Sequence, residues 1–417
     1  MTQQHSKHLR TLWIGGSAVA LFVALGIGQA LLERSASAQA KNSVQAPRFE
    51  VDPLWPKPLP NHWILGSAIG VTVDADDHIW IIHRSSATLN NNEKPLELKQ
   101  GECCAGAPPV LEFDQAGNLL RHWGGPGEGY EWPDSNHGIL IDYKGNVWIG
   151  GNGGPDSEVL KFTKDGKFLM QVGKKGARRS ATAAAGQGEG AQAGFAGGSN
   201  DEVSFGRVAK IFVDPKANEA YLADGYLNKR VAVIDADTGK MKRWWGAYGN
   251  KPDDKPLPPY DPTAPPQQQF YNPVHCADMS VDRQLYVCDR VGDRLQVFTP
   301  EGKFVKEAFY DKNTKNAGSV WDIAFSRDAQ QKYIFMADGV NEKVRVIDRQ
   351  TLQVLTVFGD GGRQPGSFYG VHSIATDSKG NVYTTETYEG KRVQRFIYKG
   401  VGAVAESQGV LWPKSAR

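Results

Sequence analysis

The sequence predicts an all-β chain folded as one six-bladed β-propeller. Three observations point to this fold: a strand–turn–strand pattern recurs six times, an aromatic residue recurs within it, and 47 glycines and 23 prolines supply frequent turns. Repeats of about 40–50 residues with four short strands each are typical of propeller blades. Hydrophobic residues make up 40% of the chain and charged residues 23%, which is a globular composition and not a disordered one.

Each copy of the repeat begins with an apolar strand, continues through a turn that contains Asp or Gly, and then forms a strand with an aromatic residue. The first strands of the copies are expected at 69–74, 138–142, 211–214, 277–281, 322–325 and 373–377. Most copies continue into a third strand, and several into a fourth. The alternation of apolar and polar residues predicts that each strand buries one face between blades.

The repeat places a single propeller domain over residues 68–400. Residues 41–67 form a lead-in, in which Phe49–Val51 is expected to add a ring-closing strand to the last blade, and 401–417 form a C-terminal tail. Three insertions are expected between copies, where they leave the blades intact and can shape a binding face. They lie at 87–109, at the Gly/Ala-rich and mobile 174–204, and at the Pro-rich 251–271.

The first 40 residues have the pattern of an export segment. Lys7 and Arg10 precede an apolar stretch at 12–32, and the small residues at 35–40 contain two small-x-small cleavage patterns. We interpret 1–40 as a signal peptide, with an uncleaved membrane anchor as the alternative. Either places the remainder outside the cytoplasm, in the periplasm or the extracellular space, where disulfides are permitted.

The charge balance restricts the classes of partner. Outside the first 40 residues, 45 basic residues balance 45 acidic ones, so this part of the chain has no net charge. This argues against nucleic acid or an anionic membrane surface as a broad electrostatic partner. We expect a monomer that acts on a small-molecule or peptide substrate and meets a membrane only if the N-terminal segment is uncleaved.

Three histidines share one position in alternate copies of the repeat. His137, His275 and His372 stand at the start of the innermost strand in copies two, four and six. Those blades are about 120° apart in a six-bladed ring, so the imidazoles can converge on the axis from one end. Three imidazoles with an open position are the ligand set of catalytic zinc, which we expect ahead of copper or iron. The same position holds Ile69, about Ala209 and about Trp321 in the other copies.

The remaining histidines and the cysteines show no such register. His83 stands beside Arg84 at a strand end and could lie near the site. Cys276 and Cys288 flank one hairpin and can form a disulfide, whereas Cys103–Cys104 can be a vicinal disulfide, a free pair or part of a lid. Three further histidines are interpreted as surface groups: His62, His78 and His122.

The blades resemble NHL repeats, and the site residues resemble those of peptidyl-α-hydroxyglycine α-amidating lyases. The strand pattern covers about 68–396 and is shared by every NHL propeller, so the site residues are the more specific part. The matching segments are His83–Arg84, Asn136–Ile139, Asp224–Arg230, Val274–His275, Asp289–Arg290 and Val371–His372.

This resemblance implies a zinc-dependent lyase that cleaves the C–N bond of a carbinolamide to give an amide and glyoxylate. It implies that the three histidines hold zinc and that Tyr226 is the general base, with Arg84 beside it and Arg290 as a second arginine. A nearby positive charge favours an ionised phenol, which can accept the hydroxyl proton. The alternative from the residues alone is that Tyr226 only packs and that the arginines pair with blade-end carboxylates such as Asp289.

Two positions depart from the family pattern. Ser373 stands where the family has an Asp that helps to hold calcium, which puts calcium in doubt for this chain, and Gly370 stands where the family has Met. We expect the glycine to leave more room beside the metal and to admit a larger substrate. Two other functions are compatible with the scaffold: a zinc-dependent hydrolase at the same site, and a non-catalytic NHL propeller that binds a ligand or a protein.

Overall fold

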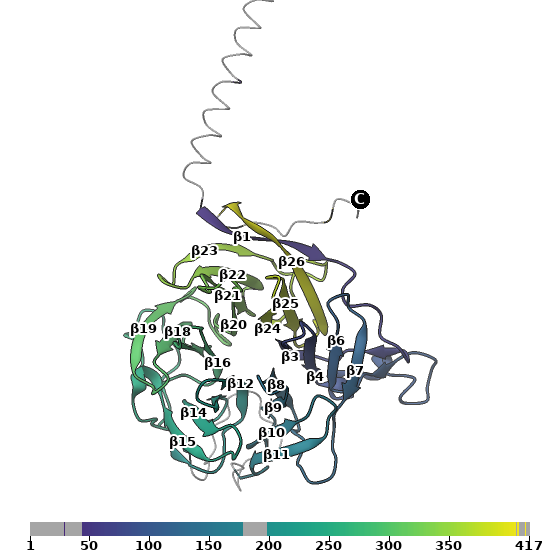
Figure 1. Cartoon of the computed structure of the whole chain (residues 1–417), viewed down its shortest axis with the longest axis horizontal. Helices are drawn as coiled ribbons and strands as arrows, with labels where there is room; N and C mark the ends of the chain where they lie inside the picture. Colours follow the sequence, from purple (N-terminus) through teal and green to yellow (C-terminus); the bar gives the residue numbers. More distant parts are fainter. Residues whose placement is uncertain (1–28, 30–43, 178–197, 406, 408–412, 414–417) are drawn as a thin grey trace, which may run out of the picture.

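A computed structural model describes residues 29, 44–177, 198–405, 407 and 413. The expected export segment lies outside the described residues except for Gln29, as do 178–197 and most of the expected tail beyond 405. In the described part of the chain, no helix combines the length and apolar character needed to cross a bilayer. Six four-stranded antiparallel sheets surround a central axis (Figure 1), which confirms the predicted six-bladed propeller.

The first strand of each blade lies nearest the axis, and the later strands follow outward. Blade 1 contains β3 (Ala68–Val73), β4 (Ile79–His83), β6 (Val110–Phe113) and β7 (Leu119–Trp123). Blade 2 contains β8 (Asn136–Ile141), β9 (Val147–Gly151), β10 (Glu158–Phe162) and β11 (Phe168–Gly173). Blade 3 contains β12 (Val208–Asp214), β13 (Glu219–Asp224), β14 (Arg230–Asp235) and β15 (Met241–Trp245). Blade 4 contains β16 (Val274–Met279), β17 (Leu285–Asp289), β18 (Arg294–Phe298) and β19 (Phe304–Phe309). Blade 5 contains β20 (Asp322–Phe325), β21 (Tyr333–Asp338), β22 (Lys343–Asp348) and β23 (Val354–Phe358).

Blade 6 is built from both ends of the described chain. It contains β24 (Val371–Thr376), β25 (Val382–Glu386) and β26 (Arg392–Val404), with β1 (Val44–Asp52) as its outermost strand. Figure 1 shows β1 and β26 side by side, and Phe49 of β1 pairs with Tyr398 of β26. Phe49 is 4% exposed and its ring packs against Phe335 and Phe358 of blade 5, so the closing strand also joins two blades.

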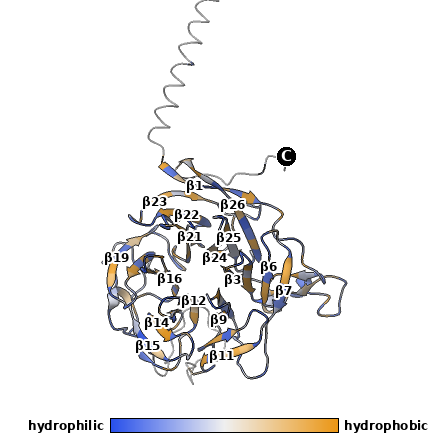
Figure 2. Cartoon of the chain, in the orientation of Figure 1, coloured by the Kyte–Doolittle hydropathy of each residue, from blue (hydrophilic) through white to orange (hydrophobic). Residues whose placement is uncertain are grey.

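The inner strands are buried on both faces, so the prediction of one buried face per strand is wrong for them. Every residue of β13 and of β17 is buried, whereas the outermost strands β7 and β11 are partly exposed. The reason is that each blade is sandwiched between two neighbours. Hydrophobic and hydrophilic residues accordingly alternate around the whole ring and do not gather in one sector (Figure 2).

The insertion at 87–109 lies inside a blade and not between two copies as predicted. It connects β4 to β6, the second and third strands of blade 1, as an extended hairpin loop at the edge of the sheet. Within it, β5 (Ala105–Gly106) pairs with β2 (Trp63–Ile64) of the lead-in. Short 3-10 helices lie at Ser85–Thr88 (η1) and Asn91–Glu93 (η2), and elsewhere at Gly198–Asn200 (η3) and Ala247–Gly249 (η4).

All four cysteines form disulfides. Cys276 of β16 bonds to Cys288, its register partner in β17, as the hairpin position allowed. Cys103 bonds to Cys104 within the insertion of blade 1, so the vicinal disulfide is the correct alternative among those left open for this pair.

Candidate metal centre

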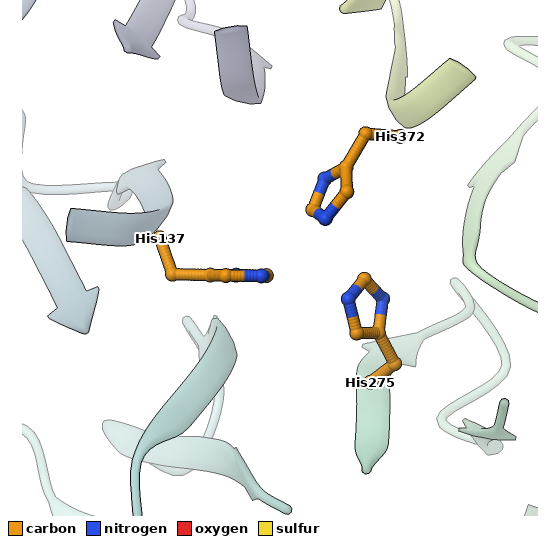
Figure 3. A group of neighbouring side chains, drawn as sticks. All are labelled: His137, His275 and His372. Atoms are coloured by element: carbon orange, nitrogen blue, oxygen red, sulfur yellow. The ribbon is translucent and has the colours of Figure 1, made fainter. Parts of the chain in front are cut away.

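The three axial histidines stand at irregularities in their strands. Pairing between β16 and β17 shifts between Val274 and Cys276 and leaves His275 outside the ladder, and the same shift surrounds His372 in β24. In β8 the shift lies between Asn136 and Ile139 and includes His137. A bulge turns the side chain of its extra residue away from the regular alternation. The three imidazoles therefore point toward one another at the axis (Figure 3).

The imidazoles form a nearly equilateral triangle. Their ring centroids are 5.1 Å apart for His137 and His275, 4.8 Å for His137 and His372, and 4.9 Å for His275 and His372. One ring nitrogen from each lies within 4.8 Å of the other two. The residues are 2–4% exposed. The structure thus brings together all three predicted metal ligands.

A backbone hydrogen bond fixes the orientation and tautomer of each imidazole. Each Nδ1 lies against a carbonyl oxygen in the next blade, and since a carbonyl only accepts, Nδ1 carries the hydrogen and donates it. Nε2 is then the free acceptor, which is the usual second-shell arrangement of a metal-ligating histidine. The three pairs are His137 with Ala209 (2.7 Å), His275 with Trp321 (2.5 Å) and His372 with Ile69 (2.7 Å). These partners are the axial residues of the other three blades.

Burial and nearby guanidinium groups keep the imidazoles neutral. Burial holds the pKa of His137 and of His275 well below the ordinary value of 6.5, and neighbouring positive charges lower both further. Burial, followed by the charges of Arg290 and Arg84, lowers the pKa of His372 to about 3. Neutral imidazole is the form that binds metal, so all three ligands are ready at neutral pH.

The hydroxyl of Tyr226 lies among the ligand nitrogens. It is 2.9 Å from Nε2 of His137, 3.1 Å from Nε2 of His275 and 3.4 Å from Nη1 of Arg290. Both Nε2 atoms are acceptors and the hydroxyl has one hydrogen, so it can satisfy only one of them at a time. A cation at the convergence of the Nε2 lone pairs would satisfy the rest. The donor set therefore fits a metal ion, and neutral imidazole suits zinc.

A close backbone approach places Tyr226 at the centre. A Cβ on Gly225 would lie 2.1 Å from the carbonyl oxygen of Val274, so only glycine lets this turn pass against the start of β16. Asp224 fixes the turn by accepting hydrogen bonds from Gly206 N (2.6 Å) and from Nε of the buried Arg230 (2.7 Å). Tyr226 is 6% exposed, so its ring does pack, as the simpler interpretation held, while its hydroxyl faces the histidines.

The two predicted arginines flank this cluster. The guanidinium of Arg290 stacks on Trp321 at 4.5 Å and approaches the ring of Tyr226 at 5.7 Å. Arg84 donates from Nη2 to Oδ1 of Asn152 at 2.9 Å, and its charge contributes to the lowered pKa of His137. Asp289, the blade-end carboxylate named above as an alternative partner, accepts from Arg294 at 2.7 Å.

Both ring nitrogens of His83 bind backbone groups of blade 1 and its lead-in. It is fully buried; Nε2 donates to the carbonyl of Pro108 at 2.9 Å, while Nδ1 accepts from the backbone of Gly66 and of Ser85. These bonds hold the end of β4, where Arg84 follows. His62 and His122 are exposed as expected, and the half-buried His78 lies 2.7 Å from Glu112.

An internal ammonium lies directly beyond the histidines along the axis. Nζ of Lys210 lies 2.7 Å from Oδ2 of Asp278 and 2.5 Å from Oδ1 of Asp322, whose other oxygen accepts from Ser373 at 2.7 Å. Burial alone would lower the pKa of Lys210, but the two carboxylates outweigh it and raise the pKa. Lys210 is the cation that both carboxylates contact, and its single charge offsets one of their two negative charges. Lys210 was missed, although it directly follows the axial residue of the third copy and is a lone lysine in an apolar strand.

Gly370 does not open a space beside the metal ligands in the way the sequence suggested. Its φ is +75°, and a Cβ there would lie 3.1 Å from the carbonyl oxygen of Thr387 and 3.2 Å from the ring of Tyr388. Its backbone N donates to Glu342 at 2.7 Å. A side chain at this position would therefore meet Tyr388 and backbone, so the expected extra room is not present in that direction.

The chain is 23% identical over 385 residues to the mouse protein NHL repeat-containing protein 3. The match covers 88% of this chain and 89% of the relative. No protein-family model matches the sequence. One similar solved structure is a catalytically inactive virginiamycin B lyase from Staphylococcus aureus with quinupristin, at 15% identity and a TM-score of 0.45, with 85% of this chain and 89% of that chain covered. Another is a streptogramin B lyase, at 13% identity and a TM-score of 0.47, with 85% of this chain and 98% of that chain covered. At these identities and scores, neither indicates a reaction or a ligand.

The blades, the register and this similarity agree on the architecture: the chain is a six-bladed β-propeller that is similar over most of its length to an NHL repeat-containing protein.

Proposed function

We propose that the protein is a metal-dependent lyase that cleaves the C–N bond of a carbinolamide-like substrate and releases an amide and glyoxylate. The observation that carries this proposal is the position of the Tyr226 hydroxyl, within hydrogen-bonding distance of two axial histidines and beside Arg290. A proton acceptor next to a His₃ metal site is the combination that this elimination requires. The resemblance to amidating lyases in the same residues supports it.

In the proposed reaction, the histidines, Tyr226 and Arg290 have different roles. A zinc ion held by His137, His275 and His372 would polarise the substrate hydroxyl and lower its pKa. Tyr226 accepts the hydroxyl proton, the C–N bond breaks as the carbonyl forms, and Tyr226 returns this proton to the departing amide nitrogen. Arg290, stacked on Trp321, favours negative charge on the phenol oxygen that it contacts.

The same proposal includes export and a monomeric state. The charged and then apolar N-terminus supports export, and two disulfides in the described residues are typical of oxidising compartments outside the cytoplasm. The substrate would be a small molecule or a peptide, because the charge balance disfavours nucleic acid.

The test is glyoxylate release from benzoyl-α-hydroxyglycine by purified zinc-loaded protein, with chelated protein as the control. We expect release that chelation abolishes and added zinc restores. If loaded protein releases no glyoxylate, the lyase proposal fails. Ester or amide hydrolysis by the same sample would then favour a zinc-dependent hydrolase, and binding without turnover would favour a ligand-binding propeller.

A further inference from the structure

Arg207 breaks the pattern of residues that precede the axial positions. It stands two residues before Ala209, at the entry to the innermost strand of blade 3. The equivalent residues of the other five blades are small or lack a charge: Ser67, Ser135, Pro273, Ser319 and Gly370. A single cation therefore stands at a position where every other blade is uncharged.

The backbone of Arg207 is held in a conformation that glycine would adopt more easily. Its φ is +65°, in the left-handed region, and the equivalent Gly370 has a φ of +75°. A non-glycine residue in this region is strained by Cβ contacts with its own backbone. The positive φ makes glycine the natural replacement for testing what the side chain of Arg207 contributes.

The guanidinium of Arg207 binds a backbone carbonyl group. Nη2 donates to the carbonyl oxygen of Gly154 at 3.1 Å, and the buried Nε has no hydrogen-bond partner. In the described ranges, no carboxylate forms an ion pair with it. The carboxylate of Asp156 acts on Arg207 only through its charge, which raises the pKa of the guanidinium and partly opposes the lowering by burial. Its oxygens accept hydrogen bonds from three backbone N–H groups. Those groups belong to Asp134, Ser135 and Gly153.

A second unpaired cation contacts the same turn. Arg84 donates to Asn152, two residues before the Gly154 that Arg207 contacts, and its Nε is likewise buried without a partner. Arg84 forms no ion pair with any described carboxylate either. Two guanidinium groups thus bind uncharged oxygens of residues 152–154, and the nearby carboxylate of Asp156, which accepts from Gly153 N, offsets only one of their two positive charges.

Arg207 also borders the candidate base. The backbone N of Tyr226 donates to the carbonyl oxygen of Arg207 at 3.3 Å. We propose that Arg207 is a specificity-determining residue that binds an anionic group, most simply a carboxylate, in the acyl part of the substrate. The substrate class would then be an N-acyl carbinolamide that is anionic at both ends. This inference rests on the proposed lyase function for the identity of the reacting end.

The test compares two unreactive glycine derivatives of equal length by isothermal titration calorimetry on zinc-loaded protein. N-Succinylglycine carries a terminal carboxylate where N-butyrylglycine carries a methyl group. A charge-assisted hydrogen bond predicts that wild type binds the succinyl probe about tenfold or more tightly at low salt. Arg207→Gly should bind the two probes equally and keep or raise its Tm, because glycine relieves the positive φ.

Three variants separate recognition from structure. Arg207→Gln retains the size of the side chain and should also lose the preference, Arg207→Lys should retain part of it, and Arg327→Gln, which removes an exposed arginine elsewhere, should leave it unchanged. Equal binding of both probes by wild type, failure of N-succinylglycine to bind at millimolar concentration, or a preference that persists in both Arg207→Gly and Arg207→Gln would overturn the inference.

The outcomes also distinguish this inference from the proposed function. If the charge preference depends on Arg207 but the α-hydroxy derivatives of both probes release no glyoxylate, the anion site stands and the lyase assignment fails. If glyoxylate is released from both derivatives at the same kcat/KM in wild type and in Arg207→Gly, the lyase stands and the anion site fails.

Discussion

The hydroxyl oxygen of Tyr226 lies 2.9 Å from Nε2 of His137, so the candidate base and a candidate metal ligand are in direct contact. These residues are 89 positions apart and come from blades 3 and 2. The contact depends on Gly225, which admits the turn, and on the bulge in β8, which directs the imidazole to the axis. In the proposed mechanism, the candidate base and a candidate metal ligand are therefore linked by one hydrogen bond.

Replacement of this phenol should remove turnover and leave the metal. Tyr226→Phe keeps the packed ring but deletes the proton acceptor, and loss of a general base typically lowers the rate by about 10²–10⁴. The measurement is glyoxylate release at equal zinc content, with Tyr143→Phe, an exposed tyrosine, as the matched control. Wild-type activity in Tyr226→Phe would assign the proton transfer to another group.

The three histidines should determine metal content together. Purified protein is expected to hold about one zinc per chain, and any single change to alanine at His137, His275 or His372 should reduce occupancy strongly, because three ligands are the usual minimum for such a site. Metal analysis after dialysis provides the readout, and the exposed His122→Ala should behave as wild type. Undiminished zinc in the triple variant would exclude this site.

The axial ammonium should stabilise the ring. Lys210→Met leaves Asp278 and Asp322 buried without their cation, and breaking a buried ion pair in this way costs about 3–5 kcal/mol. Urea unfolding of metal-free protein measures the loss, and addition of Asp278→Asn with Asp322→Asn should recover part of it. Lys255→Met, at a side chain that is 87% exposed, is the control. A loss below about 1 kcal/mol, at the level of a surface pair, would contradict the role of Lys210.

Acid should destabilise the metal-free protein through the axial histidines. His372 gains a proton near pH 6.5 when unfolded but only near pH 3 when folded, since burial lowers its folded pKa. The unfolded state then binds more protons between these values, so the stability falls as the pH is lowered from 6.5 toward 3. Relative to His372→Gln, wild type should lose about 2 kcal/mol between pH 6.5 and 5, measured by urea unfolding. Parallel pH profiles would show that His372 does not contribute.

The equivalent positions of the three histidines could be predicted from the sequence, but the orientations of their imidazole rings could not. Spacing alone predicted His137, His275 and His372 on one ring, because a repeat fixes equivalent positions. The hydrogen bonds from their Nδ1 atoms to Ile69, Ala209 and Trp321 were not predictable, since they depend on how far neighbouring blades are offset.

Other features were missed for related reasons. The burial of both strand faces follows from stacking, which a single repeat does not reveal. Arg207 and Lys210 stand on either side of Ala209, the residue in register with the histidines, yet only the structure shows which acids pair with each. Among the described residues, no acid forms an ion pair with Arg207, and two form ion pairs with Lys210. The exceptions to the repeat were therefore visible in the sequence, but their electrostatic consequences were not.

The ring closure has a consequence for biosynthesis. Blade 6 needs β1, which is translated first among the described strands, and β26, which ends at Val404. His372 also belongs to this last blade and is oriented by Ile69 of the first, 303 residues earlier. A nascent chain that has reached only blade 5 thus holds two of the three ligands and an unpaired strand. Translation through blade 6 must therefore precede assembly of the candidate centre, and termination before residue 372 removes one of its three histidines.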